Sequence, residues 1–362
     1  MPTLAENFCN FSMTTKYNVT IGIPVYNDEL YIAKSLQSAL DQDFQGEIEI
    51  LIINDCSTDS TLNVIKEVSH AHQQGLNVHI INLPQNIGVG AVRNLIIDNA
   101  KGDYLYFLDS DDYITSNCIS RLYEEAKKSD AEVVYGSIQT VTVEGETLNT
   151  GQHFLVQPEL QLLHEDGLAS YAFQNTHAHL RDYMVNILFD LRFVIKHQLR
   201  YPNLRFHEDV IFSADLVPLV SRAILLSDIT YFYVIKSNSL SNYQGRNNIQ
   251  LEEIANFFKL YTYIKEKNKS LKDKPYYEAR CARSMAQMLF IVCGALKNRR
   301  IISPPLTNRM IKAAMKHPAS LKEIMHFKHH KLINSMYYII GSLPSNLSVI
   351  TINIIARFKH LI

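Results

Sequence analysis

The chain of 362 residues is 47% hydrophobic and 20% charged, which is ordinary for a globular protein of one large domain or two modest ones. Its net charge of −1 hides an asymmetry, because residues 1–250 hold 16 Lys+Arg and 30 Asp+Glu, whereas residues 251–362 hold 19 and 6. The acidic first part argues against nucleic acid as a ligand, since a phosphate backbone requires a basic surface. The basic last part suits anionic lipid or an anionic partner.

The cysteines and the N-terminus indicate where the chain works. There are five cysteines, and no pair has the spacing of metal ligands. The N-terminus lacks the basic and apolar regions of a secretory signal. We therefore expect a reduced, cytoplasmic chain in which most cysteines are small hydrophobic residues.

The first part of the chain alternates strands with helices after a loose polar tail over residues 1–16. Short apolar runs without helical spacing predict strands at Val19–Pro24, Ile48–Ile53, Val78–Leu83 and Tyr104–Leu108. Helical patterns lie between them, over Glu29–Asp41, from about Ser60, and from a glycine loop at Gly88 to near Gly102. Strands that alternate with helices in this way predict right-handed βαβ units and a parallel sheet.

The rest of the chain is mixed at first and then helical. We expect a helix at Ile119–Lys128, a strand at Glu132–Gln139, a hairpin or loop at Val141–Thr150, a helix that starts within Arg205–Phe212, a strand at Ala223–Val234 and a polar loop at Lys236–Asn242. From Leu251 the pattern is helical and basic. The predicted fold class is therefore α/β, with a mainly parallel central sheet flanked by helices and a helical C-terminal extension.

The strand at Tyr104–Leu108 ends in three carboxylates within four residues, Asp109-Ser110-Asp111-Asp112. Such crowding costs like-charge repulsion unless a cation lies among the groups. Ligands of open α/β sheets bind at the carboxyl ends of the strands, and Mg²⁺ is usually held by one or two carboxylates and substrate phosphates. We therefore predict a divalent metal at Asp109 and Asp111 and a phosphorylated ligand. The alternative is an acidic turn that caps the next helix through Asp112 or Thr115.

Polar residues at the ends of other predicted strands, and at the starts of predicted helices, fit the same site. Asp55 follows the second strand. Its carboxylate could accept a hydrogen bond from the imide N–H of a nucleobase, and the alternative is that Asp55 belongs to a helix-capping turn. Arg93 opens a helix at the same edge, where a pyrophosphate contact and a surface salt bridge are the alternatives. His207-Glu208-Asp209 begins a predicted helix, where the carboxylates suit a general base for an acceptor hydroxyl or a helix cap.

Five motifs occur in order, and over about residues 17–242 the chain resembles the family 2 glycosyltransferases of GT-A fold, which use nucleotide sugars. The motifs are Ile23-Pro24-Val25-Tyr26-Asn27, Asn54-Asp55-Cys56-Ser57-Thr58-Asp59, Asn86-Ile87-Gly88 with Arg93-Asn94, Asp109-Ser110-Asp111-Asp112 and His207-Glu208-Asp209. Residues 231–241 also look like the loop of that family that closes over the donor.

The resemblance implies a nucleotide-sugar donor held at the strand ends. The backbone around Pro24, Val25 and Tyr26 and the carboxylate of Asp55 would hold the uracil of a UDP-sugar. Arg93 would lie near the diphosphate.

The resemblance also implies a metal and a catalytic base. Asp109, beside Ser110, would contact ribose or a metal-bound water, and Asp111 would bind Mn²⁺ or Mg²⁺. Asp209, beside Glu208, would be the base of an inverting transfer to a carbohydrate or lipid-linked glycan acceptor. Such enzymes assemble bacterial surface polysaccharides and other glycans.

On this basis, residues 17–136 would form the nucleotide-sugar-binding half, residues 137–246 the acceptor-binding half with the lid loop, and residues 247–362 a basic helical region.

Two residues depart from the family pattern. Cys56 stands where glycine is common, which is tolerable if its backbone has an ordinary conformation. Lys236 lies in a loop where Arg or His is frequent. The chain has no Trp, which argues against a processive polymerase of the cellulose-synthase type, whose Gln-x-x-Arg-Trp motif needs one.

Two other functions are open alternatives. A nucleotide-sugar-binding or scaffold subunit without catalysis would have little need of Asp209. A sugar-nucleotide nucleotidyltransferase also has a parallel sheet, but it would be expected to carry a glycine-rich basic loop after the first strand, which Tyr26–Leu30 does not provide.

The segment Leu332–Ala356 has no formal charge and is flanked by basic residues. Its length alone suits a membrane span, but Gly341–Asn346 divides it into two short pieces. We expect two helices, which either pack on the catalytic domain or form a peripheral contact at the inner membrane surface.

Overall fold

The computed structural model describes residues 16–143, 155–175, 180, 184–204, 207–236 and 248–358. The predicted tail before Lys16, most of the predicted hairpin over 141–150 and the lid loop beyond Lys236 lie outside these ranges. The chain forms two compact units. The N-terminal unit comprises residues 1–165, 181–216 and 220–236, and the C-terminal unit comprises residues 166–180, 217–219 and 237–362.

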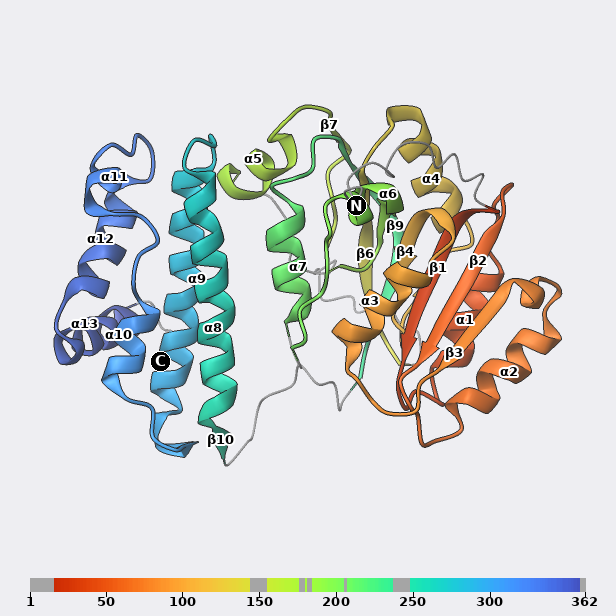
Figure 1. Cartoon of the computed structure of the whole chain (residues 1–362), viewed down its shortest axis with the longest axis horizontal. Coiled ribbons are helices and arrows are strands. Elements are labelled where there is room, and N and C mark those ends of the chain that lie inside the picture. Colours follow the sequence, from red (N-terminus) through yellow and green to blue (C-terminus); the bar gives the residue numbers. More distant parts are fainter. Residues whose placement is uncertain are drawn as a thin grey trace, which may run out of the picture. The chain divides into compact units, whose positions relative to one another are not determined.

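The N-terminal unit is built on one curled, mostly parallel sheet (Figure 1). Its strands are β1 (Tyr17–Val25), β2 (Ile48–Asn54), β3 (Val78–Asn82), β4 (Gly102–Phe107), β5 (Tyr113–Ile114), β6 (Val133–Thr142), β7 (Leu160–Leu162), β8 (Ile187–Asp190) and β9 (Ala223–Ile235). The order is β3-β2-β1-β4-β8-β6-β9-β5, with β7 beside β9. Strands β1 to β4 are parallel, as predicted, and β8 runs antiparallel between β4 and β6. The predicted fold class is therefore confirmed.

The helices of this unit connect the strands. They are α1 (Ile32–Leu40), α2 (Thr61–Ala71), α3 (Val89–Asn99), α4 (Cys118–Ser129), α6 (Leu191–Lys196) and α7 (Glu208–Leu216), with a 3₁₀ turn η1 at Gln73–Asn77. The helices predicted at the first three positions and at 119–128 are confirmed within a few residues.

Both faces of the sheet are covered because side chains alternate along each strand. Ile21 and Tyr106 point into a core that includes α1, α2 and α4. Their neighbours point to the other face, where Phe107 packs edge-on against Phe189 and where Gly22 lets Ile96 of α3 approach. Figure 1 shows α3 on the opposite side of the sheet from α1 and α2. A sheet covered on both faces exposes its strand ends, which is where the polar motifs lie.

The C-terminal unit is helical. It contains α5 (Gly167–Gln174), α8 (Leu251–Asn268), α9 (Tyr277–Lys297), α10 (Asn308–Ala314), α11 (Leu321–Met325), α12 (Lys331–Ser342) and α13 (Ser345–Phe358), with 3₁₀ turns η2 (Lys269–Leu271) and η3 (Arg299–Ile301) and a strand pair β10 (Ile249–Gln250) and β11 (Ile302–Ser303). Its core gathers around Met285, Met288 and Val292 of α9. The two helices predicted within Leu332–Ala356 are confirmed as α12 and α13.

These last two helices are apolar on two sides. One side packs into the core through Tyr337, Ile340 and Ile352. The other exposes large apolar side chains, namely Leu332, Ile339, Leu347, Ile350, Ile354 and Phe358. Within the described ranges, no helix is both long and apolar enough to cross a bilayer.

Candidate active site

A buried arginine joins two of the predicted motifs. Arg93, in the first turns of α3, is 7% exposed. Its Nη2 donates to Oδ1 of Asp109 at 2.9 Å, and its Nη1 donates to Oε1 of Glu208 at 2.6 Å. Burial alone would lower the pKa of Arg93, but the nearby charges, above all that of Asp109, raise it above its usual value. The guanidinium is therefore a fixed positive charge between the end of β4 and the start of α7.

Glycine makes this contact possible. A Cβ at Gly90 would lie 2.7 Å from the carbonyl oxygen of Pro202 and 3.4 Å from side-chain atoms of Glu208. Only a residue without a side chain lets α3 approach the segment that leads into α7 so closely. The ring of Tyr201, with its centroid 5.4 Å from Cζ of Arg93, covers the guanidinium on that side.

Asp209 is the residue after Glu208, in the first turn of α7. Its side chain is half-buried, and Oδ1 accepts the N–H of Val210 at 2.8 Å. Because Glu208 is tied to Asp109 through Arg93, the α7 start that carries Asp209 lies at the same end of the sheet as the acidic run. Asp209 and the acidic run are far apart in sequence, and the fold brings them together.

A second cation lies between two other carboxylates. The Nζ of Lys236 is 2.9 Å from Oδ2 of Asp111 and 2.9 Å from Oδ1 of Asp28, and it lies 3.9 Å from the ring centroid of Tyr31. Ser110 donates a short hydrogen bond to the other oxygen of Asp28. Burial and the charge of Asp109 raise the pKa of Asp111, and Lys236 opposes this rise. Carboxylates from the ends of β1 and β4 thus meet at one point that already holds a positive charge.

Asp112 has a different role from its neighbours. It is 1% exposed, and it accepts the hydroxyl of Tyr231 at 2.6 Å and the N–H of Val234 at 2.8 Å. Burial, followed by the charge of Asp111, raises the pKa of Asp112 well above its usual value. Asp112 therefore fastens the acidic run to β9, and it does not cap a helix.

Asp55 holds together the loops that follow β2 and β3. Its two carboxylate oxygens accept the N–H groups of Ile87 and Gly88 at 2.7 and 2.9 Å. Gly88 has φ +87°, a conformation that favours glycine. Asp55 thus joins the turn after β2 to the glycine loop before α3, and it does not cap α2.

The loops that follow β1 and β2 lie next to Asp55 in the chain or in the sheet. Pro24 and Val25 are buried at the end of β1, whereas the ring of Tyr26, directly after them, is 49% exposed. Cys56 has φ +62°, so the ordinary backbone that was the condition for tolerating this residue is not present. A non-glycine residue in this left-handed conformation costs about 1–2 kcal/mol.

Comparison with known proteins identifies the family. The model described as "Glycosyl transferase family 2" matches residues 20–187. Over these residues the chain has the domain of a family 2 glycosyltransferase. The matched range includes the strand ends and the acidic run, and α7 with Glu208 and Asp209 lies beyond it.

Curated relatives of this glycosyltransferase come from bacterial polysaccharide assembly. It is 27% identical over 322 residues to the succinoglycan biosynthesis protein ExoO of Rhizobium meliloti, covering 84% of this chain and 89% of that one. It is 27% identical over 221 residues to the poly(ribitol-phosphate) beta-glucosyltransferase of Bacillus spizizenii, covering 60% of this chain but only 32% of that longer protein.

Solved structures show the same fold. A crystal structure of residues 1–349 of S. aureus TarS in complex with UDP-GlcNAc matches with a TM-score of 0.54 at 18% identity and covers 90% of each chain. The mannosyltransferase PcManGT from Pyrobaculum calidifontis, in complex with GDP-Man and Mn²⁺, matches with a TM-score of 0.50 at 14% identity, covering 91% of this chain and 86% of that one.

The glycosyltransferase site suits a cation held partly by substrate. Within the part of the chain that the structure describes, no three His, Cys, Asp or Glu side chains form a metal-binding group. The oxygens of Asp28 and Asp111 nevertheless converge on one cation, the ammonium of Lys236. Mg²⁺ commonly binds one or two carboxylates and substrate phosphates, so this pair fits such an ion.

Sequence reasoning missed Asp28 and the pairing of Lys236. Asp28 was not named as a site residue, although its place after the first strand of a parallel sheet is a signal for the ligand edge. Asp28 and Lys236 are 208 residues apart, and no local pattern indicates that they meet.

Proposed function

We propose that this glycosyltransferase moves a sugar from a UDP-sugar to an acceptor hydroxyl with inversion, in the assembly of a bacterial surface polysaccharide or glycan. One observation carries the proposal. Arg93 binds Asp109 and Glu208 at once, and this bridge brings the predicted base, Asp209, to the predicted metal and donor site.

The donor would lie along the ends of β1, β2 and β4. The exposed ring of Tyr26 and the backbone of Pro24 and Val25 would border the uracil, and Asp55 would hold the glycine loop against it. Both terminal nitrogens of Arg93 are engaged, so its effect on the diphosphate would act through Asp109.

Asp111, with Asp109 beside it and Asp28 opposite, would hold the Mn²⁺ or Mg²⁺ ion. When bound, such an ion offsets the charge of the departing diphosphate. Lys236 would then exchange its carboxylate partners for the diphosphate, which is the other anion at this edge.

Asp209 would carry out the proton transfer. The acceptor oxygen would form a bond to the anomeric carbon on the face opposite the diphosphate, the bond from that carbon to the diphosphate oxygen would break, and the acceptor proton would pass to Asp209. The transition state has oxocarbenium character, as in glycoside chemistry in general. Glu208 would position Asp209 through its ion pair with Arg93 and would not accept the proton.

The test is a screen of UDP- and GDP-sugars for metal-dependent donor hydrolysis and transfer, followed by Asp209→Asn and Glu208→Gln. A positioned base contributes about 10²- to 10⁴-fold, so Asp209→Asn should lose that factor in transfer while UDP binding is kept. Wild-type turnover by Asp209→Asn would overturn the assignment. Donor binding without turnover by the wild type would favour the alternative, a nucleotide-sugar-binding subunit without catalysis.

We also propose that α12 and α13 form a peripheral contact with a membrane that carries a lipid-linked acceptor. Leu347, Ile350 and Ile354 lie on one face of α13 and are each about half exposed, at 51%, 53% and 52%. The test is flotation of the full chain with anionic vesicles. Replacing these three residues with Gln should reduce binding, whereas Leu76→Gln, at an exposed position of the N-terminal unit, should not. Equal binding by both variants would exclude this contact.

A further inference from the structure

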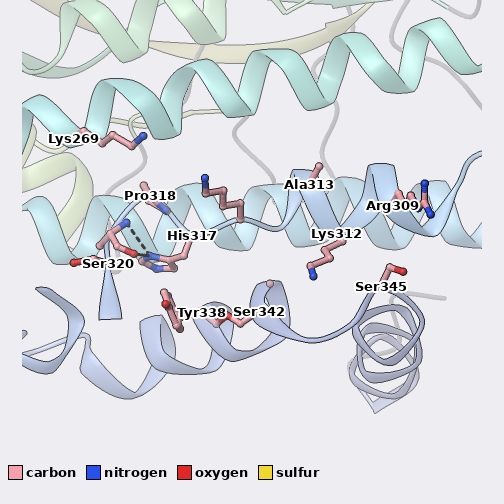
Figure 2. Close-up of a pocket in the computed structure, with 13 residues that line it drawn as sticks. Lys269, Arg309, Lys312, Ala313, His317, Pro318, Ser320, Tyr338, Ser342 and Ser345 are labelled. Atoms are coloured by element: carbon pink, nitrogen blue, oxygen red, sulfur yellow. Dashed lines mark hydrogen bonds between the residues drawn. The ribbon is translucent and has the colours of Figure 1, made fainter. Parts of the chain in front are cut away.

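The C-terminal unit contains a large basic pocket that the transfer reaction does not use. Its volume is about 890 Å³, within the range of roughly 300–1,000 Å³ of small-molecule sites. Figure 2 shows Lys312 extending from α10 into the space between this helix and α12, where Tyr338 and Ser342 form the opposite wall.

Four cations from separate segments line this basic pocket. Arg309 and Lys312 belong to α10, Lys316 follows that helix, and Lys269 comes from η2. No Asp or Glu is among the described residues of the wall. Lys269 pairs with Glu266 at 2.5 Å, but the other three side chains make no hydrogen bond or ion pair with any residue that the structure describes.

The acidic residues nearest along the chain to Arg309, Lys312 and Lys316 are engaged elsewhere. Glu323 binds Lys272 at 2.5 Å and caps α11 through Ser320, and these contacts lower its pKa to about 2. Glu278 accepts backbone N–H groups from residues 328–330. Neither carboxylate is available to neutralise the pocket, and no acidic residue follows Glu323 in the sequence.

The buried polar groups of the wall are satisfied within the protein. Nδ1 of His317 accepts the N–H of Ala319 at 3.0 Å, and Nε2 then donates to Oδ1 of Asn334 at 3.0 Å. The Nζ of Lys265 donates to the carbonyl oxygens of Ala314 and Lys316 at 2.5 and 3.0 Å. His317 is therefore part of the scaffold, whereas Lys265 places a further cationic group next to Lys316.

We propose that the basic pocket binds a ligand with phosphate groups, as a diphosphate or a phosphate diester. Arg309, Lys312 and Lys316 line one concave site without a described carboxylate partner, and a multiply charged phosphate group would supply the missing negative charge. Arg309 supplies the planar fork that suits phosphate oxygens. This inference does not depend on the proposed transfer reaction.

The observations favour a lipid as the source of the phosphate. Ile339 and Leu347, on the two helices that form part of the wall, are exposed at 57% and 51%. Exposed apolar side chains on α12 and α13 and cations on the neighbouring α10 and the residues after it line or adjoin one pocket. Apolar residues and cations near each other on a surface are typical of proteins that lie on anionic membranes. A soluble diphosphate has the same chemistry and is the second source to be tested.

The experiment compares two variants of the full chain with the same change in net charge. One replaces Arg309, Lys312 and Lys316 with Gln. The matched control replaces Lys297, Lys322 and Lys328, which are exposed lysines of the same unit, with Gln. Thermal melting of both variants checks that they fold. Binding is measured by calorimetry with inorganic pyrophosphate and by flotation with phosphatidylcholine vesicles with and without phosphatidylglycerol, all without divalent metal.

The pocket variant should bind at least about tenfold more weakly than the wild type, and the control should bind like the wild type. Binding to phosphatidylglycerol vesicles but not to pyrophosphate assigns a lipid phosphate, and the reverse assigns a soluble one. Equal loss in both variants would mean that general surface charge is responsible and would overturn the proposal. Wild-type protein that binds neither probe would overturn it as well.

Discussion

The two charged regions of this glycosyltransferase differ in whether their cationic side chains are paired with carboxylates. In the candidate active site, Arg93 and Lys236 each contact two carboxylates. In the basic pocket of the C-terminal unit, Arg309, Lys312 and Lys316 contact none among the described residues. Internally paired charges would fix the positions of the predicted catalytic groups before substrate arrives, whereas unpaired charges in a cavity suit an anion from outside. The predictions below test this difference, from the largest expected effect to the smallest.

Arg93→Met should destabilise the chain by about 3–5 kcal/mol, because it leaves the buried carboxylate of Glu208, and the partly exposed one of Asp109, without a partner. Chemical denaturation measures the free energy of unfolding. Arg121→Met is the control, since Arg121 binds three carboxylates where Arg93 binds two, but the side chain of Arg121 is 26% exposed. The control should cost about 1 kcal/mol or less. Equal losses would show that the Arg93 bridge is no more than a surface ion pair.

Lys236→Met should strengthen Mn²⁺ binding in the absence of nucleotide by about 1 kcal/mol, or roughly fivefold, because the ion no longer competes with the ammonium for Asp28 and Asp111. Asp28→Asn should change the affinity in the opposite direction. Calorimetry with Mn²⁺ alone gives both values. Weaker binding by Lys236→Met would contradict the shared cation site.

His317 should make stability sensitive to mild acid. Burial lowers the pKa of His317 below its usual value of about 6.5, so the unfolded chain binds the proton more readily than the folded one. The contribution of neutral His317 to the free energy of unfolding is therefore complete above about pH 6.5. It is lost as the pH falls below that value, by about 1.4 kcal/mol per pH unit at most. Denaturation curves at several pH values should lose this slope in His317→Gln and keep it in His329→Gln, which alters an exposed histidine. A slope that survives in His317→Gln would exclude this residue as the cause.

Cys56→Gly should stabilise the chain by about 1 kcal/mol or less, because glycine adopts the φ of +62° without strain but loses more entropy on folding. Cys56→Ala keeps the strain and serves as the control. Thermal melting compares the two, and a glycine variant no more stable than the alanine variant would show that the strain is absent.

The sequence predicts the strands that carry the site better than the ion pairs between its side chains. Strands such as β1 and β4 are buried on both faces, so their apolar runs indicate them directly. The four residues of β8 are too few for a periodic pattern, and this strand was not predicted. Asp109 and Asp111 were predicted because three carboxylates in four residues are a local signal. The partners of Arg93 and Lys236 depend on contacts over 115 and 208 residues, which only the fold determines.

The most direct test of the account is a double-mutant cycle between Asp109→Asn and Glu208→Gln, measured as free energies of unfolding. Both residues bind Arg93, which joins them in the described part of the chain, so the account predicts that their effects are coupled by about 0.5–3 kcal/mol. Effects that add to within about 0.3 kcal/mol would mean that β4 and α7 are not joined by this bridge, and the placement of Asp209 beside the donor site would be contradicted.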